Sequence, residues 1–187
     1  MPDLLLSSAS MNESPTEIWR YAVVTIGNNR IGTQNTGFVM NQQITNIDYK
    51  QISQIYKVPQ LPACPIYCGG PVNTDRVTII HSTDFSNTNT QRINEHCSIT
   101  FNKDIVTKLR QGQGPKHWKC IIGFSVWQDG QLDAEMQRRG GWMTHPWTDT
   151  VWSNYKMKNK LWKRIVRRDA ESKANLFLDT VFDTQSS

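Results

Sequence analysis

The segment from Gly69 to Arg76 combines two adjacent glycines with Asp75 and Arg76. Because glycine has no Cβ, a Gly69-Gly70 turn can aim backbone N–H groups at an anion, and the Arg76 guanidinium can add a fork of donors. No Gly-Lys-Ser/Thr follows the glycines, and this excludes a P-loop. The alternative is a tight crossing between strands, in which Asp75 and Arg76 pair with each other.

His81 follows in the next predicted strand and is a candidate general base. In a hydrolase, Ser82 or Cys68 would be the nucleophile and Asp75 would orient the imidazole. The sequence has no nucleophile elbow around Ser82 and no acid at a recognised offset. A histidine that is hydrogen-bonded to the backbone is the more ordinary interpretation, and we favour it.

The segment from Gly123 to Glu135 predicts an apolar strand that turns sharply into a helix. A helix N-terminus attracts anions, so Gln131 at that end can hold a ligand. Asp133 in the first turn can instead satisfy the free N–H groups itself. Asp133 and Glu135 are two residues apart and face different sides of the helix, which disfavours acid–base catalysis by a carboxylate pair.

Net charge is +5, and it is concentrated in residues 156–168, which carry seven basic and no acidic side chains. An apolar stripe along this predicted helix leaves a basic face that can contact nucleic acid, an acidic partner or a membrane surface. The ordinary alternative is a helix docked on the core with its basic face in solvent. The candidate contact residues are Lys160, Lys163, Arg164, Arg167 and Arg168.

Seven tryptophans and four cysteines complete the residues of chemical interest. We expect most of the tryptophans to pack in the core or at its rim. Cys64 and Cys68 lie in a predicted extended stretch, about 13 Å apart, too far for a disulfide. No Cys/His cluster completes a zinc site, so the sequence predicts four reduced, buried thiols and no metal or other cofactor.

A mixed set of strands and helices must position these residues. The predicted strands are 1–6, 22–27, 37–41, 66–68, 76–82, 93–101 and 119–127, the last of them central. The predicted helices are 46–56 capped by Asn46, 103–111 capped by Asn102, 131–139 and 157–173. Strands outnumber helices and do not alternate with them regularly, which predicts an α+β protein.

The length of 187 residues fits a single domain, 1–187, with a basic helix at about 156–173 and a loose tail after it. The sequence has no apolar run of about 18 residues and no basic segment before Leu4–Leu6. We therefore expect neither a membrane span nor a signal peptide, and a cytoplasmic location.

Three segments, in this order, resemble the AlgH/YqgE family, and the resemblance covers about residues 4–168. The segments are Pro65–Val72 with Asp75, Arg76, His81 and Ser82; Gly123–Trp127 with Gly130, Gln131, Leu132 and Glu135; and Trp142. Residues 23–24 and 37–41 also fall where the family has its first strands. The residues expected to form a structural motif are Pro71, Gly123, Trp127, Gly130, Leu132, Glu135 and Trp142. The chain departs from the family at Ser125-Val126, where a small, glycine-rich step is usual.

The resemblance implies a compact α+β fold with a mixed or antiparallel sheet, or a barrel-like core, and flanking helices. It implies no agreed enzymatic activity, and some members carry the label of transcriptional regulator. We therefore expect a non-catalytic regulatory or interaction protein that binds an unknown protein partner or a small anionic ligand. A hydrolase using His81, and a nucleic-acid contact through residues 156–168, remain the alternatives. The candidate ligand residues are Gly69, Gly70, Asp75, Arg76, His81 and Gln131.

Overall fold

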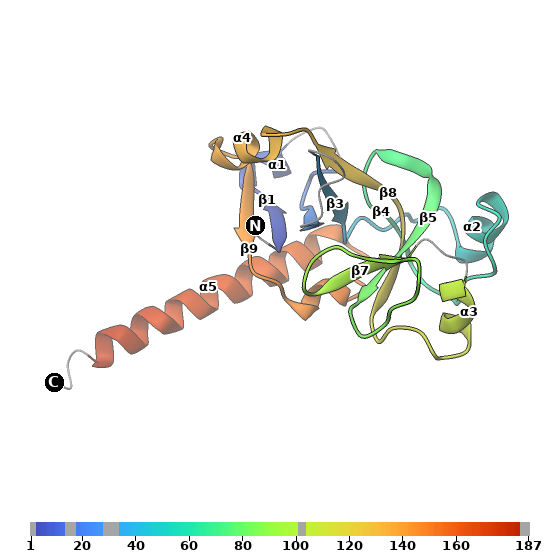
Figure 1. Cartoon of the computed structure of the whole chain (residues 1–187). Helices are drawn as coiled ribbons and strands as arrows, with labels where there is room; N and C mark the ends of the chain where they lie inside the picture. Colours follow the sequence, from blue (N-terminus) through green and yellow to red (C-terminus); the bar gives the residue numbers. More distant parts are fainter. Residues whose placement is uncertain (1–2, 14–17, 28–33, 101–103, 184–187) are drawn as a thin grey trace.

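The computed structural model describes residues 3–13, 18–27, 34–100 and 104–183, with side chains of the last helix as far as Asn175. Within these residues the strands form one nine-stranded sheet in the order β6-β7-β5-β8-β3-β2-β1-β9, with β4 added alongside β8. The strands are β1 (Leu4–Ser7), β2 (Val23–Ile26), β3 (Asn35–Val39), β4 (Ile66–Cys68), β5 (Val72–Ser82), β6 (Thr90–Arg92), β7 (Cys97–Thr100), β8 (Trp118–Trp127) and β9 (Trp142–His145). The sheet is antiparallel except for the β4–β8 pair, and it curls into a half-barrel flanked by helices (Figure 1). The predicted α+β class is confirmed.

Strand β8 lies at the centre of the sheet, as its long apolar run predicts. It pairs with β5 on one side, with β3 on the other, and in parallel with β4. The same strand therefore connects the two halves of the half-barrel. Lys119 near its start and Trp127 at its end lie in different surroundings.

The helices are α1 (Ala9–Asn12), α2 (Tyr49–Ile55), α3 (Asp104–Arg110), α4 (Gln131–Gln137), the 3₁₀ turn η1 (Asp149–Trp152) and α5 (Lys158–Asp183). Asp48, and not Asn46, caps α2: its carboxylate accepts from the N–H groups of Lys50 and Gln51, and the Gln51 side chain returns a bond to the Asp48 N–H. The predicted cap Asn102 lies outside the described residues.

Three predicted boundaries differ most from the structure. Strand β5 begins at Val72 and not at 76, so most of the expected Gly69–Arg76 turn is strand with a register shift between Val72 and Val77. The strand predicted from Ile93 begins at Cys97, because the Asn94 side chain accepts from two N–H groups and folds 93–96 into a turn. Helix α5 continues to Asp183, ten residues beyond the predicted end, through the segment expected to be a loose tail. Elements α1, β6, β9 and η1 were not predicted.

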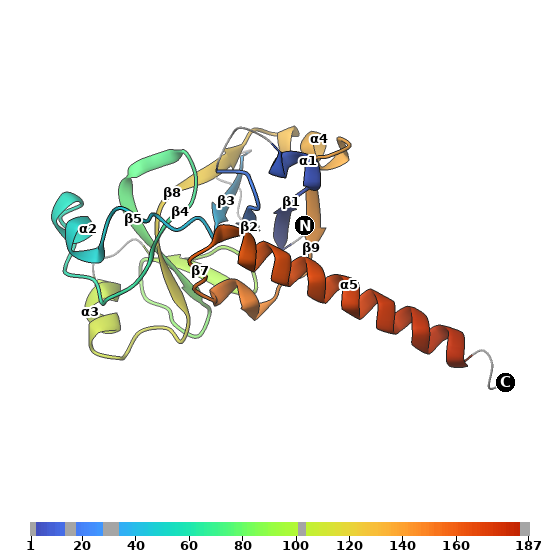
Figure 2. The same ribbon diagram turned by 180° about the vertical axis from the view of Figure 1, so that it is seen from behind.

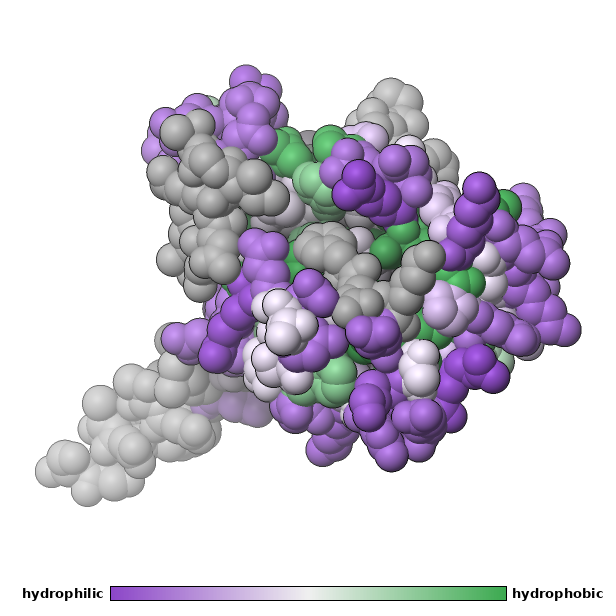
Figure 3. Space-filling model, turned by 45° about the vertical axis from the view of Figure 1, so that its right-hand side comes forward, coloured by the Kyte–Doolittle hydropathy of each residue, from purple (hydrophilic) through white to green (hydrophobic). Residues whose placement is uncertain are grey.

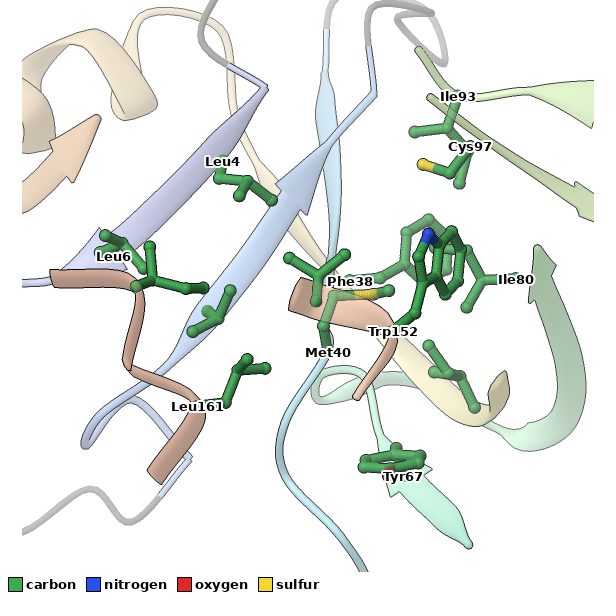
Figure 4. Close-up of a cluster of buried hydrophobic side chains, with 14 of the residues drawn as sticks. Leu4, Leu6, Phe38, Met40, Tyr67, Ile80, Ile93, Cys97, Trp152 and Leu161 are labelled. Carbon is green, nitrogen blue, oxygen red and sulfur yellow. The ribbon is translucent and has the colours of Figure 1, made fainter. Parts of the chain in front are cut away.

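Alternate residues of β1 and β2 enter different clusters, so both faces of this part of the sheet are buried. Leu4, Leu6 and Val23 pack in one cluster, and Leu5 and Val24 pack in another. Figure 4 shows the first cluster, which contains Trp152 from η1, Leu161 from α5, Phe38 and Ile80 from the sheet, and Met40 directly after β3. A third cluster lies around Ile52, Ile105 and Ile122, under α2 and α3.

Helix α5 begins against the sheet and then leaves the body of the molecule (Figures 1 and 2). Leu161 and Ile165 are buried, whereas residues 171–175 are all exposed. On the face of the molecule in Figure 3, apolar side chains reach the surface in small patches between hydrophilic ones. Among the described residues no helix is long and apolar enough to cross a membrane.

Candidate functional site

Three glycines let two backbone segments cross at the start of β5. Gly69 N–H donates to the carbonyl of Ile122 at 2.8 Å, so the chain leaving β4 lies directly against β8. A Cβ on Gly123 would overlap the Gly70 carbonyl oxygen, and a Cβ on Gly70 would overlap the backbone of Phe124. Gly123 also has φ +72°, a conformation that glycine adopts without strain. The crossing places Val72 opposite Phe124 in the sheet.

Ser125, where the chain departs from the resemblance, strengthens this crossing. Its hydroxyl donates to the Gly69 carbonyl at 3.2 Å, and Val126 pairs with Thr36 as an ordinary strand residue. The positive φ of this region falls on Gly123 and not on Val126, so valine at 126 does not have to adopt a left-handed conformation.

Trp19, Trp127 and Trp142 lie in contact next to this crossing. The ring centroids are 5.6 Å apart for Trp19–Trp142, 6.1 Å for Trp127–Trp142 and 6.3 Å for Trp19–Trp127. Two of the pairs are edge-to-face, an arrangement that the ring quadrupoles favour. Trp127 ends β8, Trp142 begins β9 and Trp19 lies in the connection before β2, so folding brings together three distant parts of the chain.

The carboxylate of Glu135 from α4 fixes two of these rings. Its Oε2 accepts from the indole Nε1 of Trp127 and from that of Trp142, both at 2.9 Å, and its Oε1 accepts from Gln131 Nε2 at 2.8 Å. Trp127 and Trp142 are 3% and 7% exposed, so their indole N–H groups need a partner inside the protein. Glu135 therefore determines the orientation of both indoles.

The crossing, the tryptophans and α4 together surround a cavity of about 360 Å³, called here the tryptophan pocket. Pro71 and Val72 line one side, and Gln131 and Glu135 line another. The double-glycine bend and the strand-to-helix corner are thus neighbours, and they hold three of the candidate ligand residues: Gly69-Gly70 in the bend and Gln131 at the corner. The full lining is Met11, Trp19, Pro71, Val72, Ser125, Val126, Trp127, Gln131, Glu135, Arg138, Gly140, Gly141 and Trp142.

Gln131, the predicted ligand residue at the start of α4, is already engaged at both ends of its side-chain amide. Its Oε1 accepts from the Gln128 N–H at 3.0 Å, and its Nε2 donates to Glu135. Gly130 provides a left-handed N-cap with φ +73° and no side-chain bond. Leu132 is buried in the cluster that contains Trp127.

Asp75 and Arg76 do not line the tryptophan pocket. Both are exposed and lie in the irregular part of β5, between Val72 and Val77. Six residues of extended chain separate Asp75 from His81, roughly 20 Å. The structure therefore does not bring Asp75, Arg76 and His81 to one place.

His81 is fully buried, and both ring nitrogens are in use. Nδ1 lies 2.8 Å from the Ser82 carbonyl oxygen, which only accepts, so Nδ1 carries the proton and Nε2 accepts from the Thr100 hydroxyl at 2.9 Å. Burial lowers the pKa of His81 below 6.5, against the opposing effect of the Ser82 carbonyl. The ring is therefore neutral at neutral pH and has no hydrogen bond to Cys68, Asp75 or the Ser82 hydroxyl.

The five predicted basic contact residues lie together on the exposed side of α5. With Tyr155 and Glu171 they line a shallow concave surface, the basic surface, made of Lys160, Lys163, Arg164, Arg167 and Arg168. Arg167 pairs with Glu171 at 2.7 Å, and Arg168 donates to the Thr150 hydroxyl at 3.0 Å. The predicted apolar stripe of this helix faces the core.

Lys119 is a buried cation that sequence reasoning missed. It is 2% exposed in β8, and its Nζ donates to the carbonyls of Met40 at 3.0 Å and Ser153 at 3.3 Å, 4.1 Å from the centre of the Tyr67 ring. Burial lowers the pKa of Lys119 to about 7. A lysine within the apolar run 118–127 is the signal that could have revealed it.

All four thiols are free, but Cys64 and Cys68 are half-buried and not buried as expected. Across the described ranges no group of three or more His, Cys, Asp or Glu side chains is placed to hold a metal ion.

Fold and site together define a class: a single-domain α+β protein whose half-barrel sheet carries a small, aromatic-walled pocket. The model of the AlgH-like family matches residues 4–172, and the chain belongs to this family.

Relatives in this family share about a third of aligned residues. The chain is 29% identical over 139 residues to a UPF0301 protein of Jannaschia sp., covering 72% of this chain and 71% of the relative. It is 37% identical over 82 residues to a UPF0301 protein of Rhizorhabdus wittichii, covering 44% of each. It is 34% identical over 119 residues to a UPF0301 protein of Rhizobium leguminosarum, covering 59% of each. The aligned stretch thus spans about half the length of several of these relatives.

Two solved structures share the fold. The solution structure of AlgH from Pseudomonas aeruginosa has a TM-score of 0.67 at 23% identity, covering 96% of this chain and 92% of that one. Protein DIP2367 from Corynebacterium diphtheriae has a TM-score of 0.64 at 17% identity, covering 89% and 86%.

Proposed function

We propose that this protein is a non-catalytic regulatory or interaction protein that binds a small ligand in the tryptophan pocket. The observation that carries the proposal is a cavity of about 360 Å³ that three separate parts of the chain build together. This volume lies within the range of small-molecule sites, and such sites combine apolar walls with a few polar groups. Here the walls are Trp19, Trp127 and Trp142, and the charged groups are Glu135 and Arg138.

A binding role suits this pocket better than catalysis. Both oxygens of Glu135 accept hydrogen bonds, so the carboxylate is held as a fixed wall and not as a free base. His81, the predicted general base, is buried with both nitrogens occupied. We place this function in the cytoplasm, because four free thiols are typical of a reducing compartment.

The test is a titration of ¹⁵N-labelled protein with a set of fragments of both charges. The indole N–H signals of Trp127 and Trp142 should shift, because these groups line the pocket through their Glu135 bonds. The indole N–H of Trp162, bonded to the Ser7 carbonyl at 2.9 Å, is the internal control and should stay still. A complete lack of shifts at Trp127 and Trp142 would remove the proposal.

A second candidate function is contact with nucleic acid through the basic surface. Three exposed cations, Lys160, Lys163 and Arg164, lie beside Tyr155 on one concave surface, which offers charge for phosphates and a ring for stacking. The affinity for single-stranded DNA should fall steeply with salt and weaken further in a Lys160→Gln, Lys163→Gln variant. An affinity for single-stranded DNA that does not change with salt concentration would exclude this function.

A further inference from the structure

We propose that the tryptophan pocket selects a small organic ammonium cation, such as a quaternary alkylammonium compound, free in solution. The proposal rests on the function proposed above and adds the charge of the ligand. It differs from the sequence-based expectation of an anion, which depended on Asp75, Arg76 and the start of α4.

The first argument is the negative charge of Glu135. Its three hydrogen-bond donors, two indoles and one amide, are all neutral. Hydrogen bonds hold the carboxylate in place without cancelling its charge, and no ion pair of Glu135 occurs among the described residues. The wall of the pocket therefore carries a fixed negative charge, which favours a cation.

The second argument is the arrangement of the rings. Trp19, Trp127 and Trp142 all line the cavity, with centroids 5.6–6.3 Å apart and mutual angles of 47–87°, so a small cation in the cavity lies beside all three indoles. Two of these indoles donate their N–H to a carboxylate, which increases the electron density of the ring faces. Tryptophan is the best cation–π partner among the side chains, and quaternary ammonium groups are typically recognised by sites lined with aromatic rings.

The third argument is the rest of the lining. Met11, Pro71 and Val72 add apolar contact for alkyl groups. A volume of about 360 Å³ admits a small molecule as a whole, which favours a free metabolite-sized cation.

Arg138 is the group that opposes a cation in the pocket. It lines the cavity but is exposed, so solvent screens its charge more strongly than that of half-buried Glu135. Removing the Arg138 charge should change the affinities for cations and for anions in opposite directions. Arg138→Gln should strengthen the binding of a cation and weaken the binding of an anion.

The experiment compares choline with 3,3-dimethyl-1-butanol, which has the same shape without the charge, and with benzoate as the anion. Binding is followed by the indole signals of Trp127 and Trp142. Choline should bind at least about tenfold tighter than its neutral isostere, because cation–π attraction and the Glu135 charge act on choline alone. Equal affinity for the two, or tighter binding of benzoate, would overturn the cation proposal.

Glu135→Gln keeps an acceptor for both indoles and removes the charge. It should weaken choline about tenfold and leave 3,3-dimethyl-1-butanol unchanged. Asp133→Asn is the matched control, since Asp133 is an exposed carboxylate on the same helix that does not line the pocket. If Glu135→Gln does not fold, Arg138→Gln decides the sign: weaker choline binding in that variant counts against the proposal.

The outcomes separate the two proposals. Should none of the three compounds shift the indole signals of a folded protein, the binding function fails as well. Should the neutral isostere or benzoate shift them as strongly as choline, the pocket binds ligands but the cation inference is wrong.

Discussion

At the scale of single residues, the site depends on glycines, which have no side chain, and on tryptophans whose orientation is fixed by hydrogen bonds. Gly69, Gly70 and Gly123 leave room for two backbones to cross, and Glu135 orients two buried indoles. The cost of disturbing such positions follows from what surrounds each one, and two glycines with nearly the same backbone conformation show this directly.

Gly123→Ala and Gly130→Ala make a matched pair. Both glycines have φ near +72°, but a Cβ on Gly130 meets nothing within 4 Å, whereas one on Gly123 overlaps the Gly70 carbonyl. Gly130→Ala should lower the free energy of unfolding by about 1 kcal/mol, the cost of a left-handed alanine. Gly123→Ala should lower it by at least about 3 kcal/mol, since the backbones must also separate.

Urea denaturation of the two variants measures this difference. Equal destabilisation would mean that the crossing tolerates a side chain and does not constrain the pocket.

At the scale of elements, Lys119 joins three parts of the fold from the central strand. Its Nζ donates hydrogen bonds to the carbonyl of Met40, directly after β3, and to the carbonyl of Ser153, directly after η1. It also lies over the ring of Tyr67 in β4. Desolvation makes this arrangement sensitive to pH.

The stability of the protein should rise between about pH 7 and pH 9. The pKa of Lys119 is about 7 when folded, against an ordinary 10.5, so the unfolded chain binds more protons in this range and higher pH favours folding. The slope should reach at most about 1.4 kcal/mol per pH unit. Above pH 9 the rise is offset, because burial raises the pKa of Cys97 from 9.0 to about 12 and the folded state then binds the extra proton.

Lys119→Met removes this titration and should flatten the profile between pH 7 and pH 9. Denaturation midpoints at several pH values, for the wild type and the variant, measure the slopes. A variant that keeps the wild-type slope would show that other groups cause it.

At the scale of the whole molecule, the first turns of α5 are bonded to strand β1 and to the residues that follow β3. Trp162 Nε1 donates to the Ser7 carbonyl, and the Asn41 side chain donates to the Lys158 carbonyl at 2.9 Å. Ile165 and Leu161 bury their side chains in the cluster of Figure 4, while the helix beyond them projects from the body.

Ile165→Ala should therefore lower the free energy of unfolding by about 3 kcal/mol, as expected for a cavity in a buried cluster. Arg164→Ala, one residue earlier and exposed, should change it by less than about 0.5 kcal/mol. Chemical denaturation of both variants checks the pair. Similar small effects would mean that α5 is only loosely attached.

Local patterns in the sequence determined most of the elements. The apolar run 119–127 predicts a central strand, and the stripe at 161, 162, 165 and 166 predicts the inward face of α5; both depend on neighbours in the chain. The same logic failed where side chains compete locally, as at Asp48 and Asn94, and where a short strand such as β9 forms only by pairing with β1.

The sequence by itself also indicated that the double-glycine bend and the strand-to-helix corner matter, because glycines and polar residues follow strand ends there. Only the tertiary structure decided what they build. Trp19, Trp127 and Trp142 meet from three distant segments, and two of them share the carboxylate of Glu135. No spacing in the chain encodes that meeting. Asp75, Arg76 and His81 look like a site in sequence, but an extended strand holds its residues apart and alternates their sides, so proximity along the chain did not become proximity in space.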